Sequence, residues 1–196
     1  MTTLRVAITL SSTILLASCA AGRYAAPATD AVKHEDVVAA PYERAWSAAV
    51  DRLSSSFYGI NQIDKASGLI SLQFTSSDHT LVDCGVVDVA AGQLPGVRPY
   101  SEFLFLNHAA QLAGRINVFI KPAGPDKAVA RATVRFVLNT PRADPTLIPS
   151  TWVFDTGTSA TLQVGTLIGG GRARTCRSSG KLEADILSAI RAAANQ

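Results

Sequence analysis

Hydrophobic residues recur every three to four positions in two stretches of the chain, and this period predicts two amphipathic helices. The first helix begins after Pro41, which suits a first turn because its missing N–H is not needed there. Its apolar positions are Tyr42, Trp46, Ala49, Val50 and Leu53. The second helix covers 181–194, with Gly180 as a candidate cap and Glu183 in its first turn. Its apolar positions are Leu182, Ile186, Ala189, Ile190 and Ala193.

Between these helices, apolar and polar residues alternate along several short stretches, a pattern typical of half-buried strands. The predicted strands are 57–64 with 69–75 as a first hairpin, 115–121 with 128–138 as a second hairpin, and 152–154 with 158–164 as a further strand or pair. Two helices that flank a run of antiparallel strands predict an α+β fold. In this architecture a curved antiparallel sheet carries an N-terminal and a C-terminal helix packed on one face.

Residues 76–114 show neither period clearly. A turn-rich run extends from Gly92 to Pro99, and the apolar run 103–106 fits either a strand or the start of a short helix. Long irregular stretches within a domain often carry a binding site. We therefore expect either residues 76–112 or a sheet edge to contribute the contact surface.

The N-terminus has the parts of a secretory signal. Arg5 supplies the positive charge, and Val6–Ala17 is an apolar run shorter than the roughly 20 residues that span a bilayer. The run ends in Leu16-Ala17-Ser18-Cys19, which resembles a bacterial lipobox. The resemblance implies cleavage before Cys19 and transfer of a diacylglycerol group to its thiol, so that Cys19 carries palmitate-type acyl chains. The alternative is an ordinary signal peptide or an N-terminal membrane helix.

On this interpretation the chain consists of a lipoprotein signal peptide at 1–18, a lipidated flexible tether at 19–39 and a single α+β domain at 40–196. Small and polar residues without a period favour the tether, although Val37 and Val38 fit the start of a strand. Ala20 occupies the position where, by the same resemblance, an Asp would retain the protein at the inner membrane. We therefore expect a lipid anchor in the bacterial outer membrane and a domain that faces the periplasm.

The charge balance excludes one class of partner. The chain has 196 residues, with 18 Lys and Arg against 15 Asp and Glu. The only charged residue of the predicted leader, 1–18, is Arg5. The chain after the leader therefore has 17 basic and 15 acidic residues, a net charge of +2. Nucleic-acid binding requires a concentrated basic face, which this balance does not supply. We expect no nucleic-acid partner.

Three cysteines are present, and lipidation of Cys19 leaves Cys84 and Cys176. In the oxidising bacterial envelope such a pair usually forms a disulfide, the alternative being two buried thiols. We expect the disulfide. A disulfide that closes a loop of about 90 residues restricts the unfolded chain and so adds roughly 4–5 kcal/mol to the free energy of unfolding.

A local basic cluster precedes the second predicted helix and comprises Arg172, Arg174, Arg177 and Lys181. Beside a helix N-terminus it is a candidate site for an anion such as a lipid headgroup or a peptidoglycan carboxylate. The alternative is a strand edge whose charges face solvent. A nucleotide-binding phosphate loop does not fit, because that motif places Ser or Thr after Gly-Lys and Leu182 stands there.

Catalytic and metal-binding patterns are weak. His34, His79 and His108 lack metal-ligand spacing, and a zinc site would need distant loops to join His79 and His108 with Asp83. Cys84 near His79 suggests a thiol nucleophile, but a disulfide explains the same residue. The carboxylates that a glycoside hydrolase would have to gather in one cleft are Glu43, Asp64, Asp83 and Glu102. We expect no catalytic residue, metal or cofactor.

Residues 41–74 read Pro-Tyr-x-x-Ala-Trp, a helix, and then Ile-x-x-x-Asp-x-x-x-Gly-x-Ile. This pattern resembles the BamC-like domains of envelope lipoproteins and implies a small α+β domain, an analogy for fold and not for function. We expect a membrane-anchored envelope lipoprotein that acts as a non-enzymatic binding or assembly module for an envelope protein.

Two alternatives to the binding module belong to other classes. One is a binder of a lipid or a cell-wall fragment, with a pocket between helix and sheet, and the other is an envelope hydrolase. A closed helix–sheet pocket of more than roughly 300 Å³ would favour the small-ligand binder. A filled core would favour the docking module.

Overall fold

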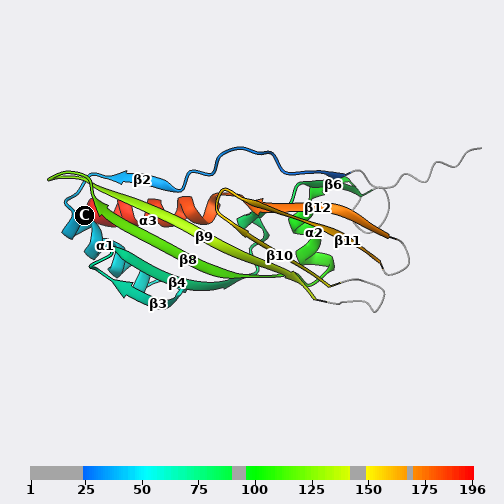
Figure 1. Ribbon diagram of the computed structural model, residues 1–196, viewed down its shortest axis with the longest axis horizontal. Coiled ribbons are helices and arrows are strands. Elements are labelled where there is room, and N and C mark those ends of the chain that lie inside the picture. Colours follow the sequence, from blue (N-terminus) through cyan, green and yellow to red (C-terminus); the bar gives the residue numbers. More distant parts are fainter. Residues whose placement is uncertain (1–23, 90–95, 142–148, 167–169) are drawn as a thin grey trace, which may run out of the picture.

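The computed structural model describes residues 24–89, 96–141, 149–166 and 170–196 (Figure 1). These residues form an elongated, mostly β-structured body, with the start of the described chain at one end and the C-terminus at the other. The helices are α1 (Tyr42–Ser54), α2 (Tyr100–Asn107) and α3 (Lys181–Ala194), and a 3-10 turn, η1, covers His79–Leu81.

The largest sheet has six strands, in the order β10-β9-β8-β4-β3, with β2 paired to another part of β9. The bounds are β2 (Glu35–Val38), β3 (Gly59–Asp64), β4 (Leu69–Ser76), β8 (Gln111–Pro122), β9 (Ala128–Thr140) and β10 (Ser150–Asp155). All of these pairings are antiparallel. The two predicted hairpins are confirmed as β3–β4 and β8–β9, because the alternating apolar residues of β4, β8 and β9 lie on the buried face.

Two smaller antiparallel sheets have three strands each. One has the order β1-β6-β7, with bounds β1 (Tyr24–Ala25), β6 (Val86–Val89) and β7 (Gly96–Pro99). The other has the order β11-β12-β5, with bounds β11 (Ser159–Thr166), β12 (Gly170–Ser178) and β5 (Val82–Asp83). The helix α2 lies at the same end of the molecule as these two sheets (Figure 1).

The predicted architecture, α+β with one curved antiparallel sheet and an N-terminal and a C-terminal helix on one face, is wrong. The strands are divided among three sheets, and a third helix is present. The error comes from strands that lack hydrophobic alternation. The sequence of β12 is Gly-Gly-Arg-Ala-Arg-Thr-Cys-Arg-Ser, and the buried positions near its end are Cys176 and Ser178 where an aliphatic strand would place Val or Ile.

The predicted helices 42–53 and 181–194 are confirmed as α1 and α3, which contact each other. Their apolar sides differ slightly from the prediction, since α3 also buries Glu183 and Leu187, whereas Ala189 and Ala193 are half-buried. Large side chains from the helices and the six-stranded sheet fill the core between them. Examples are Trp46, Leu53, Ile70, Leu72, Ile116, Phe136, Trp152, Ile186 and Ile190.

The segment predicted as a flexible tether, 19–39, lies along the body from Tyr24 onward. β1 pairs with β6, β2 pairs with β9, and residues 26–34 run between these two pairings (Figure 1). We call residues 26–34 the strap. The predicted signal peptide at 1–18, the lipobox and the lipidation site Cys19 lie outside the described residues.

Candidate functional site

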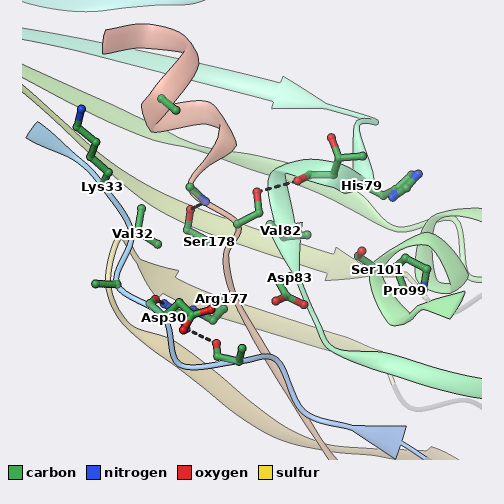
Figure 2. A pocket seen from close by; sticks show the side chains of 16 residues that line it. Asp30, Val32, Lys33, His79, Val82, Asp83, Pro99, Ser101, Arg177 and Ser178 are labelled. Atoms are coloured by element: carbon green, nitrogen blue, oxygen red, sulfur yellow. Dashed lines mark hydrogen bonds between the residues drawn. The ribbon is translucent and has the colours of Figure 1, made fainter. Parts of the chain in front are cut away.

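An open groove of about 500 Å³ lies beside the strap (Figure 2). The strap forms one wall, η1 and β5 form the opposite wall, and the end of β12 with the start of α3 lies between them. The charged residues that line the groove are Asp30, Lys33, Asp83 and Arg177. These charges of both signs stand beside a larger apolar share of the lining surface, so the groove suits a partner that offers polar and apolar groups together.

Asp78 fixes the wall that η1 contributes. Its carboxylate accepts hydrogen bonds from the Thr80 N–H at 2.9 Å and the Thr80 hydroxyl at 2.5 Å, which caps the 3-10 turn. The Thr80 hydroxyl, its N–H and the Lys181 ammonium together hold the pKa of Asp78 below its ordinary value. The Ser179 hydroxyl then donates to the Thr80 carbonyl at 2.7 Å, so this wall is joined directly to the start of α3.

Glu183 stabilises the start of α3 from the inside. Its side chain is fully buried, and the Ser178 hydroxyl lies 2.8 and 3.0 Å from its two carboxylate oxygens. The Thr156 hydroxyl donates to one of these oxygens at 2.7 Å. The Ser178 oxygen also accepts the Gly180 N–H at 3.0 Å, so the network satisfies an amide at the beginning of the helix. Glu183 is therefore placed as a structural residue rather than as a groove acid.

Arg177 holds the strap against the body. Its guanidinium donates hydrogen bonds to the backbone carbonyls of Ala28 and Asp30. A second contact joins His34 Nε2 to Arg131 on β9 at 3.2 Å. The groove wall is therefore formed by a segment that is attached at both ends and in the middle.

The predicted disulfide between Cys84 and Cys176 is confirmed, with an S–S distance of 2.08 Å. Both residues are fully buried, and the bond lies beside the pairing of β5 with β12. The interpretation of Cys84 as a thiol nucleophile is wrong, because its sulfur is bonded to Cys176.

The four basic residues predicted as an anion site have separate surroundings. Arg177 bonds to the strap, and the Arg174 guanidinium carbon lies 4.3 Å from the centre of the Tyr24 ring. Lys181 pairs with two carboxylates, one of them Asp185 at 3.1 Å. Arg172 is exposed on β12. Three of the four charges therefore have partners within the described protein, which leaves little support for a shared anion site.

The structure also separates the residues of the predicted zinc alternative. His79 and Asp83 both line the groove, but His108 packs against Phe103, with ring centres 5.1 Å apart. Burial lowers the pKa of His108. Across 24–89, 96–141, 149–166 and 170–196, no group of three or more His, Cys, Asp or Glu residues is placed to hold a metal ion.

Each of the four carboxylates considered for a glycoside hydrolase has its own separate surroundings. Glu43 accepts a hydrogen bond from Lys65 at 2.6 Å, and Glu102 accepts one from Arg98 at 3.3 Å. Asp64 accepts the Ser67 hydroxyl at 2.7 Å in the β3–β4 turn. Asp83 is the member of this set that lines the groove. The groove therefore does not hold two of these four carboxylates.

Sequence reasoning missed the strap and the groove that it borders. One local signal was the pair Val37 and Val38, which lies within β2. β1 has only two residues, too few to show an alternation. Tyr24 was the other available signal, an isolated aromatic residue in a polar stretch.

Comparison with known proteins adds no relative, because no protein-family model matches the chain and no curated protein matches it. Among the helices of the described residues, none is both long and apolar enough to cross a membrane.

Proposed function

We propose that this chain is a lipid-anchored protein of the bacterial envelope whose domain is a non-enzymatic binding module, and that it docks an envelope protein in the groove beside the strap. The groove carries this proposal: it is open, has a volume of about 500 Å³ and is lined by charges of both signs. Such walls complement a polar peptide segment, whose backbone and side chains offer both donors and acceptors.

The shape of the interior supports docking over the binding of a small lipid. The groove lies between the strap and η1–β5 and not between helix and sheet, where large side chains fill the core. A surface depression bordered by α1 and α3 has a volume of about 220 Å³, below the size usual for a ligand pocket.

Two further features support a location in the bacterial envelope. The lipobox Leu16-Ala17-Ser18-Cys19 supplies an anchor by resemblance, and Ala20 favours the outer membrane. The buried Cys84–Cys176 disulfide is typical of oxidising compartments such as the periplasm.

The docking proposal is tested by a photocrosslinking amino acid at Ala31, an exposed strap residue that lines the groove. We expect a discrete crosslink to one envelope protein in intact cells, and we expect Ala184→Trp to abolish it by filling the groove. Ala192→Trp is the matched control, because Ala192 is exposed on the same helix and does not line the groove. A copurifying lipid without a protein crosslink would overturn the proposal.

The anchor is tested by Cys19→Ser with fractionation of cells. We expect the wild-type protein in the membrane fraction with an acylated Cys19, and the variant in the soluble periplasmic fraction. Wild-type protein that stays in the membrane with an uncleaved leader and no acyl chain on Cys19 would contradict the lipid anchor and favour an N-terminal membrane helix.

A further inference from the structure

One face of the β1-β6-β7 sheet carries four apolar side chains beside the half-buried Asp88, which pairs with Val97 and shares this face. Ala25 pairs with Val86, and Val86 pairs with Pro99, so these three side chains form one row across the three strands. Val97 lies two residues before Pro99 on β7 and therefore shares this face. Val86 and Val97 are 40 % and 69 % exposed, respectively. We call Ala25, Val86, Val97 and Pro99 the apolar row.

The other face of the same sheet is occupied by the body. Tyr24 pairs with Val87, and Val87 pairs with Arg98, and all three are half-buried. The Tyr24 ring meets the Tyr100 ring of α2 edge to face, with centres 5.8 Å apart. The sheet is therefore fixed on one side and leaves the apolar row without a cover among the described residues.

The lipidation site lies very near this sheet along the chain. Cys19 precedes Tyr24 by five residues, which span at most about 18 Å when fully extended. Tyr24 is held in place on the body, because its hydroxyl accepts the Thr175 N–H at 2.9 Å and its ring lies under Arg174. An anchor at Cys19 would thus bring the β1-β6-β7 end of the body close to the bilayer.

We propose that the apolar row rests on the lipid surface in which Cys19 is anchored. This inference depends on the lipid anchor of the proposed function and adds the orientation of the domain. The short reach from Tyr24 favours lipid over a second protein as the occupant, and burial of apolar surface away from water is favourable at a membrane as it is in a protein core. The α2 residue Leu106, 63 % exposed, belongs to the same end of the molecule (Figure 1).

This orientation also determines where the groove lies relative to the bilayer. Pro99 belongs to the apolar row and lines the groove, so one border of the groove lies near the membrane surface. α1 and the C-terminal end of α3 lie at the opposite end of the body (Figure 1). A partner in the groove would then be engaged close to the membrane.

The test uses the full-length acylated protein in vesicles of phosphatidylethanolamine and phosphatidylglycerol, with and without brominated acyl chains, which quench nearby tryptophan. The fluorescence of Val97→Trp reports whether the apolar row contacts acyl chains. Val37→Trp is the matched control, because Val37 is 54 % exposed and lies on β2, near the other end of the body (Figure 1). The emission of the buried Trp46 and Trp152 is subtracted with the wild-type protein. Val86→Trp provides a second position in case Val97→Trp does not fold.

We expect brominated vesicles to quench Val97→Trp and shift its emission to shorter wavelength, and to leave Val37→Trp unchanged. Acylated protein that floats with the vesicles but shows equal quenching at both positions would overturn this inference and leave the anchor intact. Protein whose Cys19 carries no acyl chain would overturn the anchor and this inference together. A crosslink from position 97 to another protein, without quenching, would assign the apolar row to a protein partner instead.

Discussion

The guanidinium carbon of Arg174 lies 4.3 Å above the centre of the Tyr24 ring. This contact joins the first described residue of the chain to β12, and the Tyr24 hydroxyl adds hydrogen bonds to the N–H and carbonyl of Thr175 at 2.9 and 3.2 Å. A partly desolvated cation–π contact contributes about 1 kcal/mol. Tyr24 is therefore fixed to β12 at the start of β1.

Arg174→Ala is expected to loosen this segment without unfolding the domain, because it removes the cation over Tyr24 and leaves the core untouched. Amide hydrogen exchange over residues 24–33 should accelerate, while exchange in β8 and β9 should not. Arg135→Ala, an exposed position on β9, is the control. Unchanged exchange in 24–33 would contradict the role of Arg174.

Replacing both Cys84 and Cys176 with Ala is expected to lower the free energy of unfolding by about 4–5 kcal/mol, since the bond closes a loop with a sequence separation of 92. Urea denaturation of oxidised wild type, reduced wild type and the double variant measures the effect. Reduced wild type and the variant should behave alike. Two thiols that react in the unreduced, denatured wild-type domain would contradict the disulfide.

Glu183→Ala is expected to destabilise the protein by about 3 kcal/mol, because it opens a cavity and removes the acceptor of the buried Ser178 and Thr156 hydroxyls. Glu183→Gln keeps one acceptor oxygen and should cost less. Glu43→Ala, which removes an exposed partner of Lys65, should have little effect. Urea denaturation at neutral pH compares the three variants, and equal effects of Glu183→Ala and Glu43→Ala would contradict the structural role of Glu183.

Asp78→Ala is expected to lower stability by about 1 kcal/mol at neutral pH through loss of the η1 cap. The folded-state pKa of Asp78 lies below its ordinary value of 3.8. Its contribution is therefore fully present above that ordinary value and is lost as the pH falls through the folded-state pKa. Denaturation at neutral pH and in strong acid should show the difference from wild type shrinking in acid.

Asp78→Asn is the control for this pH dependence, because an asparagine caps a turn almost as well as an aspartate but cannot ionise. Its stability difference from Asp78→Ala should stay nearly constant with pH. A difference between wild type and Asp78→Ala that does not change in acid would contradict the role of the ionised carboxylate.

Gly114→Ala is expected to destabilise the protein by about 1–3 kcal/mol through overpacking. An added Cβ would lie 2.2 Å from the Arg135 carbonyl oxygen and 2.7 Å from the Phe74 ring, and neither the β9 backbone nor a packed ring moves easily. Gly59→Ala is the matched control, because the three atoms nearest to its Cβ would all belong to the flexible Gln73 side chain. Thermal unfolding compares the two, and equal melting temperatures would contradict the close packing of β8 and β9 here.

The sequence by itself determined the elements whose signal is local. The 3.6-residue period around Trp46 and Ile186 predicts α1 and α3, and the alternation in β4, β8 and β9 predicts the two hairpins, because the partners in each hairpin are neighbours along the chain. The pairing of Cys84 with Cys176 followed from counting cysteines. The resemblance of Leu16-Ala17-Ser18-Cys19 to a lipobox also rests on the sequence alone and stays a prediction.

Only the tertiary structure decided the division into three sheets, the strap and the groove. β1 pairs with β6, β5 pairs with β12, and Arg177 bonds to Ala28 and Asp30. These strands are short or polar, and their partners lie tens of residues to about 150 residues away. Their stability comes from backbone hydrogen bonds, a disulfide and side-chain contacts that exist only after the chain has folded, so no periodic pattern records them in advance.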